Sequence, residues 1–442
     1  MTAASPAGPG QPPEPGQPPE PGQPLGQPPG RPLGRRLLGW LHGPATMPGW
    51  PAPPPWRAAL PVAAVGLIAA SLIVAHRSGL PQQFDPLAPF VVGTGWGMDH
   101  ALAAQGVVIR SGPSEIGYDG QWFLGQAYDP LLRGEVAATF DAPRYRALRG
   151  LLPAAGWLLA AGQPAAIPYA LLALLILAVG AGCAGCARVI SAHGRSRWWG
   201  LGFAAVPGTV VGVAYGTAEP LGLALAVLGL SLLFDRRPGW AGLAFAGAAL
   251  TKENYLAFGL IAGLYLAVDS YLAGRNPLRA SLLVAGPGLI GLAGWWWYVA
   301  RALPPDAGAE RALVVFAPPP LGWWETLGLI VRGDYPEQAL WWGWAVLVGT
   351  LGLLLVALAR AVTRRRSVLA YPAVLWSGYG LSLSGLLLGR FLSAQRALAP
   401  AVLAAGVFLI AAGLARRTGA PAPAPPAAAP PLAAPPAAAP LD

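Results

Sequence analysis

The sequence predicts an all-α integral membrane protein, and three observations support this fold class. Charged residues make up 11% of the chain and hydrophobic residues 55%, whereas a soluble globular domain carries roughly a quarter charged residues. The mean hydropathy is +0.49. Apolar runs long enough to cross roughly 30 Å of hydrocarbon alternate with short arginine clusters, which is the pattern that orients a membrane protein.

The net charge of +10 comes almost entirely from arginine, because Lys252 is the only lysine in the sequence. Such a basic balance can indicate a nucleic-acid partner. Here the arginines form short clusters between apolar runs, so the lipid bilayer is an expected partner and nucleic acid is not. Cys183 and Cys186 lie within one apolar run, where two thiols cannot complete a zinc site of four ligands. They are expected to pack as small hydrophobic residues.

Composition divides the chain into three parts. Residues 1–57 repeat proline and glycine and are expected to form a disordered tail, because this segment has too little apolar surface to fold. Residues 58–414 are expected to form the polytopic membrane domain, and residues 415–442 a second disordered tail, rich in alanine and proline. With every arginine cluster in the cytoplasm, both tails are cytoplasmic and the chain is a multi-pass protein of the plasma membrane.

This orientation predicts about ten transmembrane helices. The short stretch 151–162 reaches only about 18 Å as a helix, so it is expected to be half-inserted; if it crosses, the number becomes about eleven. Two long loops, 77–150 and 301–339, then face the extracytoplasmic side, and the first should hold short helices near 99–109 and 122–132 along the membrane surface. The expected spans are 58–76, 167–187, 198–216, 219–234, 239–251, 254–272, 281–300, 340–359, 368–388 and 397–414.

The expected topology gathers ionisable residues on the extracytoplasmic face. Charges within or near a membrane span are costly and indicate function by default. We expect these residues to form a cationic recess suited to a phosphate, beside acids suited to proton transfer. A structural alternative stands for each: helix capping for Glu219, a mutual ion pair for Lys252 and Glu253, and interfacial anchoring for Arg390 and Arg396. The acids of the first loop on this face include Asp119, Asp129 and Asp141.

Four motifs follow one another along the chain: Y-D-G-Q-W-F from Tyr118, D-A-P-R-Y-R-A-L-R-G-L-L-P from Asp141, A-E-P-L-G-L-A-L from Ala218 and L-T-K-E-N from Leu250. Their order and their places in the expected topology resemble the GT-C superfamily, whose members are polytopic glycosyltransferases that use polyprenyl-phosphate-linked sugars. The resemblance covers about residues 58–414 and is strongest to bacterial mannosyltransferase-like members.

The resemblance implies a GT-C-like fold, a polyprenyl-phosphate-linked sugar donor, and a glycan or glycolipid acceptor in the cell envelope. It also implies a catalytic acid in the first outer loop, and Asp119 is the matching position. Many relatives carry a D-x-D or E-x-D pair that can hold a divalent metal, whereas Gly120 and Gln121 follow Asp119 here. No metal or other cofactor is therefore expected.

The expected reaction transfers one sugar, with mannose as the candidate, at the outer leaflet. Asp119 would accept the proton of the acceptor hydroxyl as its oxygen attacks the anomeric carbon, with inversion because no second carboxylate acts as nucleophile. Lys252, Arg390 and Arg396 would meet the charge that develops on the leaving phosphate. Glu253 would orient Lys252. The further candidate substrate-binding residues are Tyr118, Gln121 and Glu219.

Two alternative functions use the same residues. A transporter or flippase of lipid-linked sugars would also carry polar residues in its cytoplasmic half and often a pseudo-symmetric repeat, and neither is evident in the sequence. A non-catalytic membrane protein of envelope assembly is also compatible with the sequence. An enzyme requires Asp119 within reach of a groove that opens toward lipid and is floored by Lys252, whereas an Asp119 remote from Lys252 and Arg390 favours the scaffold.

Overall fold

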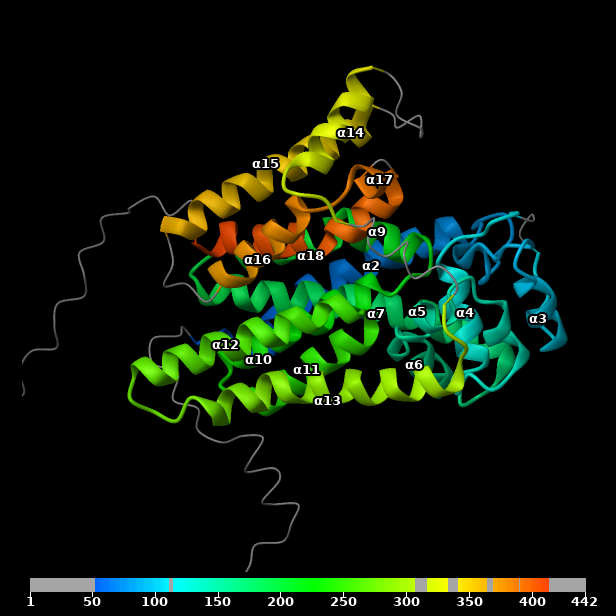
Figure 1. The fold of residues 1–442 in the computed structure, drawn as a ribbon, viewed down its shortest axis with the longest axis horizontal. Helices are drawn as coiled ribbons and strands as arrows, with labels where there is room; N and C mark the ends of the chain where they lie inside the picture. The colour runs from blue at the N-terminus through cyan, green and yellow to red at the C-terminus, as the bar shows by residue number, and fades with distance from the viewer. Residues whose placement is uncertain are drawn as a thin grey trace, which may run out of the picture.

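The computed structural model describes residues 52–110, 114–306, 316–332, 341–363, 369–388 and 390–412. Within these residues every regular element is a helix, and β-type contacts are confined to two isolated bridges. This confirms the all-α class. Figure 1 shows most of the long helices packed side by side, with the helices of the first loop gathered at one end of the bundle. Both expected tails lie almost wholly outside the described residues.

Five helices in the described part of the chain are long and apolar enough to cross a membrane, which supports a membrane protein. The described apolar parts of two further helices are shorter, at Glu219–Phe234 and Ala345–Ala361. They belong to α10 (Glu219–Phe234) and α15 (Trp341–Thr363). The five long helices correspond to α2 (Leu60–Arg77), α7 (Ile167–Ala192), α12 (Leu256–Leu272), α13 (Leu278–Ala302) and α18 (Phe391–Ala412).

Two of the expected spans are not continuous helices. The segment 198–216 is divided into η5 (Arg197–Leu201), α8 (Gly202–Ala205) and α9 (Pro207–Ala214). The division falls at Val206, whose ψ of 121° is extended because a residue before proline disfavours the α conformation. The segment 368–388 is likewise divided, and its two helices are α16 (Ala370–Leu381) and α17 (Gly385–Leu388).

Two other apolar helices are short, as the sequence predicts. Helix α11 (Pro238–Thr251) has 14 residues and reaches about 21 Å, so the turn that follows it at Lys252 lies closer to the core than the end of a full span would. Helix α6 (Leu151–Leu159) has nine residues, or about 14 Å, which is too short to cross on its own. The half-inserted interpretation of 151–162 is therefore consistent with its length.

The first outer loop holds short helices, but they do not simply lie along a surface. Helix α3 (Met98–Ala104) ends earlier than expected, and α4 (Gly120–Tyr128) begins two residues before 122. Residues 120–127 of α4 are all buried, so this helix is part of the core. A Cβ on Gly120 would overlap the carbonyl oxygen of Tyr215, so glycine permits α4 to begin directly against the segment that leads into α10. The remaining short helices of the loop are η2 (Ala88–Phe90), η3 (Glu135–Thr139) and α5 (Pro143–Ala147).

The core is built around α7, which contacts α2 on one side and α10 on another. Helix α11 contacts both α10 and α13, and α13 also packs against α12. Helix α18 contacts α16, α15 and α9, and α4 packs against α6 and α7. These contacts bring the N-terminal ends of α4 and α10, the C-terminal end of α11 and the first turns of α18 to one region, at the end of the bundle that carries the first loop (Figure 1).

Candidate active site

Asp119 directly precedes α4 in a turn that the surrounding backbone holds in place. Gly117 has a φ of +71°, a left-handed conformation that favours glycine, and the amide of Tyr118 donates to the carbonyl of Val91 at 3.0 Å. Gln121 braces the same turn, since its side-chain oxygen accepts from the amide of Gly93 at 2.8 Å and its nitrogen donates to the carbonyl of Ile116 at 3.1 Å. The turn therefore positions the Asp119 carboxylate.

Gln121 is thus a positioning residue in this structure. It is only 1% exposed, and both polar atoms of its amide group are hydrogen-bonded to backbone. The expected contact of Gln121 with a sugar hydroxyl is not supported, because the side chain faces the loop rather than the recess. A helix turns by about 100° per residue, so the residue two positions after Asp119 need not share its direction.

Two arginines hold the Asp119 carboxylate. Arg146 donates to one oxygen at 3.0 Å, and Arg396 donates to the other at 2.6 Å. Arg146 is itself held by Asp141 through two further hydrogen bonds, at 2.8 and 2.9 Å. Arg146 therefore keeps a complete bidentate partner even when its bond to Asp119 is broken.

Glu219 forms the other half of the same assembly. It is the first residue of α10 and 1% exposed, and one of its oxygens accepts from Lys252 at 3.0 Å and from Arg396 at 2.9 Å. Its second oxygen accepts from the hydroxyl of Thr217 at 2.5 Å. Arg396 thus joins Glu219 to Asp119. We call the connected side chains the central network: Asp119, Asp141, Glu219, Arg146, Lys252 and Arg396.

The central network carries no net charge, because its three acids are matched by its three bases. The expected cationic recess is therefore wrong as a description of this site. The sequence predicts Asp119 as a base and Glu219 as a sugar ligand, but in the structure these two carboxylates neutralise Lys252 and Arg396. Lys252 still has unused capacity, since only one of its three N–H groups donates to Glu219.

Glu253 does not orient Lys252. Its carboxylate accepts two hydrogen bonds from Arg149, both at 3.0 Å, and Arg149 also donates to the hydroxyl of Tyr145 at 2.5 Å. The backbone at Lys252 is extended, with φ −156° and ψ 123°, so neighbouring side chains point to opposite sides. The expected pairing of adjacent residues is corrected for this reason.

Tyr118 lies at the network, whereas Arg390 does not. The guanidinium of Arg396 lies over the Tyr118 ring, 5.4 Å from its centroid. The Tyr215 ring also packs against the Tyr118 ring, with 4.7 Å between the two centroids. Among the described residues, none forms a hydrogen bond with the buried Tyr118 hydroxyl. Arg390 is exposed and forms none of the ion pairs found among the described residues. It precedes α18, six positions before Arg396.

Asp129 also lies outside the network. Its carboxylate accepts from the backbone amides of Arg133 at 2.9 Å and Gly134 at 2.7 Å, which closes the turn after α4. This acid has a local structural role and provides a matched control for Asp119 within the same loop.

The charges around Asp119 set its protonation. Burial alone would raise the pKa of Asp119, but the positive charges of Arg396 and Arg146 outweigh burial and hold this pKa well below its usual value. Burial raises the pKa of Tyr118, so its hydroxyl stays neutral. The Asp119 side chain nevertheless keeps 29% of its surface exposed. It is an accessible carboxylate that is ionised at neutral pH.

Sequence reasoning did not assign roles to Arg146, Arg149 and Thr217. The motif that begins at Asp141 contained a usable signal, because it places three arginines within six positions, at 144, 146 and 149. Thr217 precedes the A-E-P motif by one residue and carried no signal that distinguishes it from other threonines.

Arg144, in the same motif, has a structural function. Its guanidinium donates to the carbonyls of Leu303 at 3.0 Å and Ala300 at 2.8 Å, at the C-terminal end of α13. In return, Asp306 accepts from the backbone amides of Arg144 at 2.9 Å and Tyr145 at 3.1 Å. These reciprocal contacts fasten α5, and with it Arg146, to the end of α13.

An apolar groove of about 590 Å³ runs between α6 and α13 and reaches the end of α11. None of the described residues that line it is charged. Gly150 and Leu250 are among its lining residues. Gly150 directly follows Arg149 in the sequence, and Leu250 lies two positions before Lys252. Trp295 packs onto Gly150 so closely that a Cβ there would lie 2.7 Å from the indole ring. One end of the groove is therefore continuous with the segments that carry Arg149 and Lys252.

Within the described ranges, no group of three or more His, Cys, Asp or Glu side chains is arranged to hold a metal ion. Comparison of the chain with protein-family models, with curated proteins and with solved structures gives no match.

Proposed function

We propose that this chain is an inverting glycosyltransferase that moves a sugar from a polyprenyl-phosphate donor to a hydroxyl group of a cell-envelope acceptor. One observation carries the proposal: an accessible, ionised carboxylate, Asp119, is linked through Arg396 and Glu219 to Lys252, beside an apolar groove. The proposal includes a GT-C-like architecture with about ten crossings in the plasma membrane, cytoplasmic termini and an extracytoplasmic active site.

Acceptor binding requires a free position on the Asp119 carboxylate, and Arg146 can provide it. Arg146 makes one hydrogen bond to Asp119 but two to Asp141, so it can release Asp119 and keep a bidentate partner. An acceptor hydroxyl would then donate to the vacated oxygen. Arg396 would keep its bond to the second oxygen and fix the orientation of the carboxylate.

In the chemical step, the acceptor oxygen bonds to the anomeric carbon while the bond from that carbon to the phosphate oxygen breaks. The electron pair of the broken bond leaves with the phosphate, and the hydroxyl proton moves to Asp119. The lowered pKa of Asp119 makes it a weak base, so the proton is transferred late, after the attacking oxygen has become positively charged. Such timing suits a transition state with oxocarbenium character.

The leaving phosphate gains negative charge, which Lys252 is placed to meet. Two of its three N–H groups are not committed to Glu219, so it can donate to a phosphate oxygen without losing that partner. The apolar groove between α6 and α13 suits the prenyl chain, because its described lining residues are uncharged and it adjoins the segments of Arg149 and Lys252. An apolar groove of this kind supports a lipid-linked donor over a soluble nucleotide sugar.

The test compares Asp119→Asn with Asp129→Asn in membranes that contain the full chain. Transfer of radiolabelled mannose from polyprenyl-phosphate mannose to endogenous glycolipid should fall about 10²–10⁴-fold in Asp119→Asn, because a positioned general base typically raises the rate by this factor. Asp129→Asn should retain activity, because that acid only closes a turn. Full activity in an Asp119→Asn protein that reaches wild-type levels in the membrane would rule out the assigned base.

A non-catalytic role in envelope assembly is the second candidate function. It is favoured by the neutrality of the central network, since fully paired charges are also what a structural network would show. Under this alternative, membranes with the wild-type chain transfer no more sugar than membranes without it, and Asp119→Asn changes only the thermal stability. Transfer that depends on the wild-type chain excludes the alternative.

A further inference from the structure

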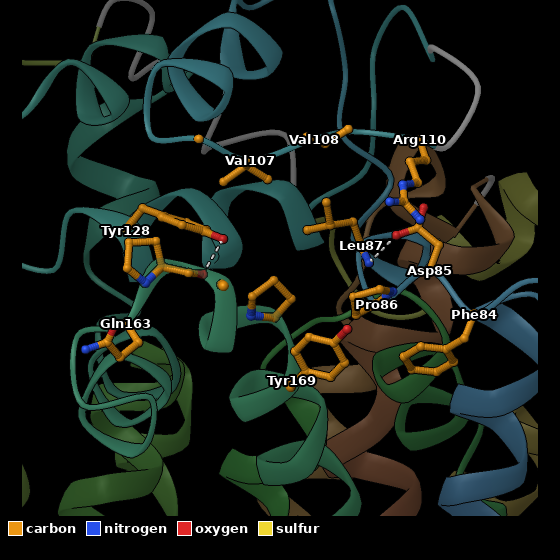
Figure 2. A pocket seen from close by; sticks show the side chains of 14 residues that line it. Phe84, Asp85, Pro86, Leu87, Val107, Val108, Arg110, Tyr128, Gln163 and Tyr169 are labelled. Carbon is orange, nitrogen blue, oxygen red and sulfur yellow. Dashed lines mark hydrogen bonds between the residues drawn. The ribbon is translucent and has the colours of Figure 1, made fainter.

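A second cavity, of about 500 Å³, lies at the start of α7, away from the central network. Three segments that are distant in sequence build it: residues 84–87 after α2, residues 106–110 after α3, and residues 163–169 at the start of α7. Tyr128, the last residue of α4, completes the wall. We call this the outer cavity, and its size falls within the range of ligand pockets. Figure 2 shows its lining side chains.

The outer cavity is separate from the candidate active site. Asp119 precedes α4 and Tyr128 ends it, so the length of this nine-residue helix, about 14 Å, lies between the two. No residue of the central network lines the cavity. A small ligand bound here therefore does not reach Asp119.

An aromatic surface forms one side of the outer cavity. The rings of Phe84 and Tyr169 are stacked, with centroids 6.1 Å apart and an angle of 25° between their planes. They come from different segments and still expose 36% and 54% of their surface. Aromatic ring faces are electron-rich and attract the C–H bonds that the faces of a sugar ring present. The ring surface that stays exposed on Phe84 and Tyr169 offers such a face to a sugar ring.

The polar groups around this surface suit a neutral, hydroxyl-rich ligand. In Figure 2, Asp85 and Arg110 lie on one side of the cavity and Tyr128 and Gln163 on the other. The Asp85 carboxylate already accepts from the amide of Leu87 at 2.9 Å, so the Arg110 guanidinium is the donor to ligand hydroxyls on this side, and the carboxylate beside it offsets its attraction for an anion. The mixed signs therefore argue against a phosphate headgroup.

Tyr128 adds a fixed acceptor. Its hydroxyl donates to the carbonyl of Pro164 at 2.9 Å, and burial raises its pKa to about 12, so the group stays neutral. With its proton directed to Pro164, the oxygen presents lone pairs to a ligand hydroxyl. Gln163 provides both a donor and an acceptor next to it.

From these contacts we infer that the outer cavity binds a neutral saccharide unit of the acceptor glycan, one α4 length away from the hydroxyl that reacts. The identification of this saccharide with the acceptor rests on the proposed function, but the saccharide site itself does not. An acceptor held at both places would be an oligosaccharide rather than a single sugar.

The test is calorimetric titration of the purified full chain with mannotetraose and with maltotetraose, without any donor. At least one should bind, and Tyr169→Ala should weaken its binding by about tenfold or more, as loss of a stacking surface predicts. Tyr271→Ala is the matched control, because Tyr271 is 73% exposed and does not line the cavity. Its affinity should equal that of the wild type.

Three outcomes overturn the inference. The first is no binding of either tetrasaccharide up to about 10 mM, and the second is binding by Tyr169→Ala that is as tight as binding by the wild type. The third is binding of glycerol 1-phosphate but not of the saccharides, which would indicate a lipid headgroup site. The result also separates the two proposals. Saccharide binding that depends on Tyr169 in a chain without transfer activity refutes the proposed function alone. Transfer with an acceptor KM that Tyr169→Ala leaves unchanged refutes the outer cavity alone.

Discussion

Helix α10 has an acid at each end, the buried Glu219 and the partly buried Asp235, and the two acids are paired in different ways. At its C-terminal end, Asp235 binds Arg188 with both oxygens, at 2.7 and 2.9 Å. Arg188 is 2% exposed and also donates to Ser231 at 2.7 Å and to the carbonyl of Pro54 at 2.9 Å. At the N-terminal end, one oxygen of Glu219 is shared between two cations, Lys252 and Arg396.

The difference teaches how a structural ion pair is distinguished from a candidate site. Arg188 uses four of its five N–H groups, and the ring of Trp56 covers its guanidinium at 4.0 Å, so this 2%-exposed side chain is closed to a ligand. In the central network, Lys252 keeps two N–H groups and the Asp119 side chain keeps part of its surface. Spare hydrogen-bonding capacity next to an opening, rather than charge alone, is what marks the second region.

The largest effect on stability is expected from breaking the closed pair. Asp235→Asn leaves the buried Arg188 charge without its partner and should lower the free energy of unfolding by about 3–5 kcal/mol. Thermal unfolding of the chain in detergent measures this loss. The double change Arg188→Met with Asp235→Leu removes both charges and should recover much of the stability. A double variant that is as unstable as Asp235→Asn would contradict the closed-pair interpretation.

The pH dependence of the central network is the next test. Because the pKa of Asp119 is lower in the folded chain than in the unfolded one, its contribution to stability is complete above the ordinary aspartate pKa of about 3.9 and is lost as the pH falls below it. The difference in Tm between the wild type and Asp119→Asn should thus be constant from about pH 5 to pH 8 and shrink below about pH 4. A difference that grows on acidification would contradict the two arginine contacts of Asp119.

The smallest effect on stability is expected for Tyr118→Phe. No residue in the described part of the chain forms a hydrogen bond with the Tyr118 hydroxyl, and the ring that remains keeps its contacts with Arg396 and Tyr215. The free energy of unfolding should change by less than about 0.5 kcal/mol. If the hydroxyl contacts the substrate, the KM for donor or acceptor rises while Tm stays unchanged. A Tm that falls by many degrees would indicate that the hydroxyl has a structural partner instead.

Much of the candidate site was predictable because topology constrains where charges meet. Asp119, Glu219, Lys252 and Arg396 were expected on one face, and the structure joins these four side chains by hydrogen bonds. Arg390 was placed with them on the same reasoning, but it precedes α18 and is exposed. Nearness in sequence to Arg396 was not enough, since side-chain direction depends on the local backbone.

The sequence by itself determined the all-α membrane class, because the scarcity of charge and the spacing of arginines are visible without any contact. It also determined which turn carries the candidate base, through the Y-D-G-Q motif. Only the tertiary structure decided how the charges pair: extended backbone at Lys252 sends Lys252 to Glu219 and Glu253 to Arg149. Pairing depends on the directions of side chains from five separate segments, and that information appears only when those segments pack together.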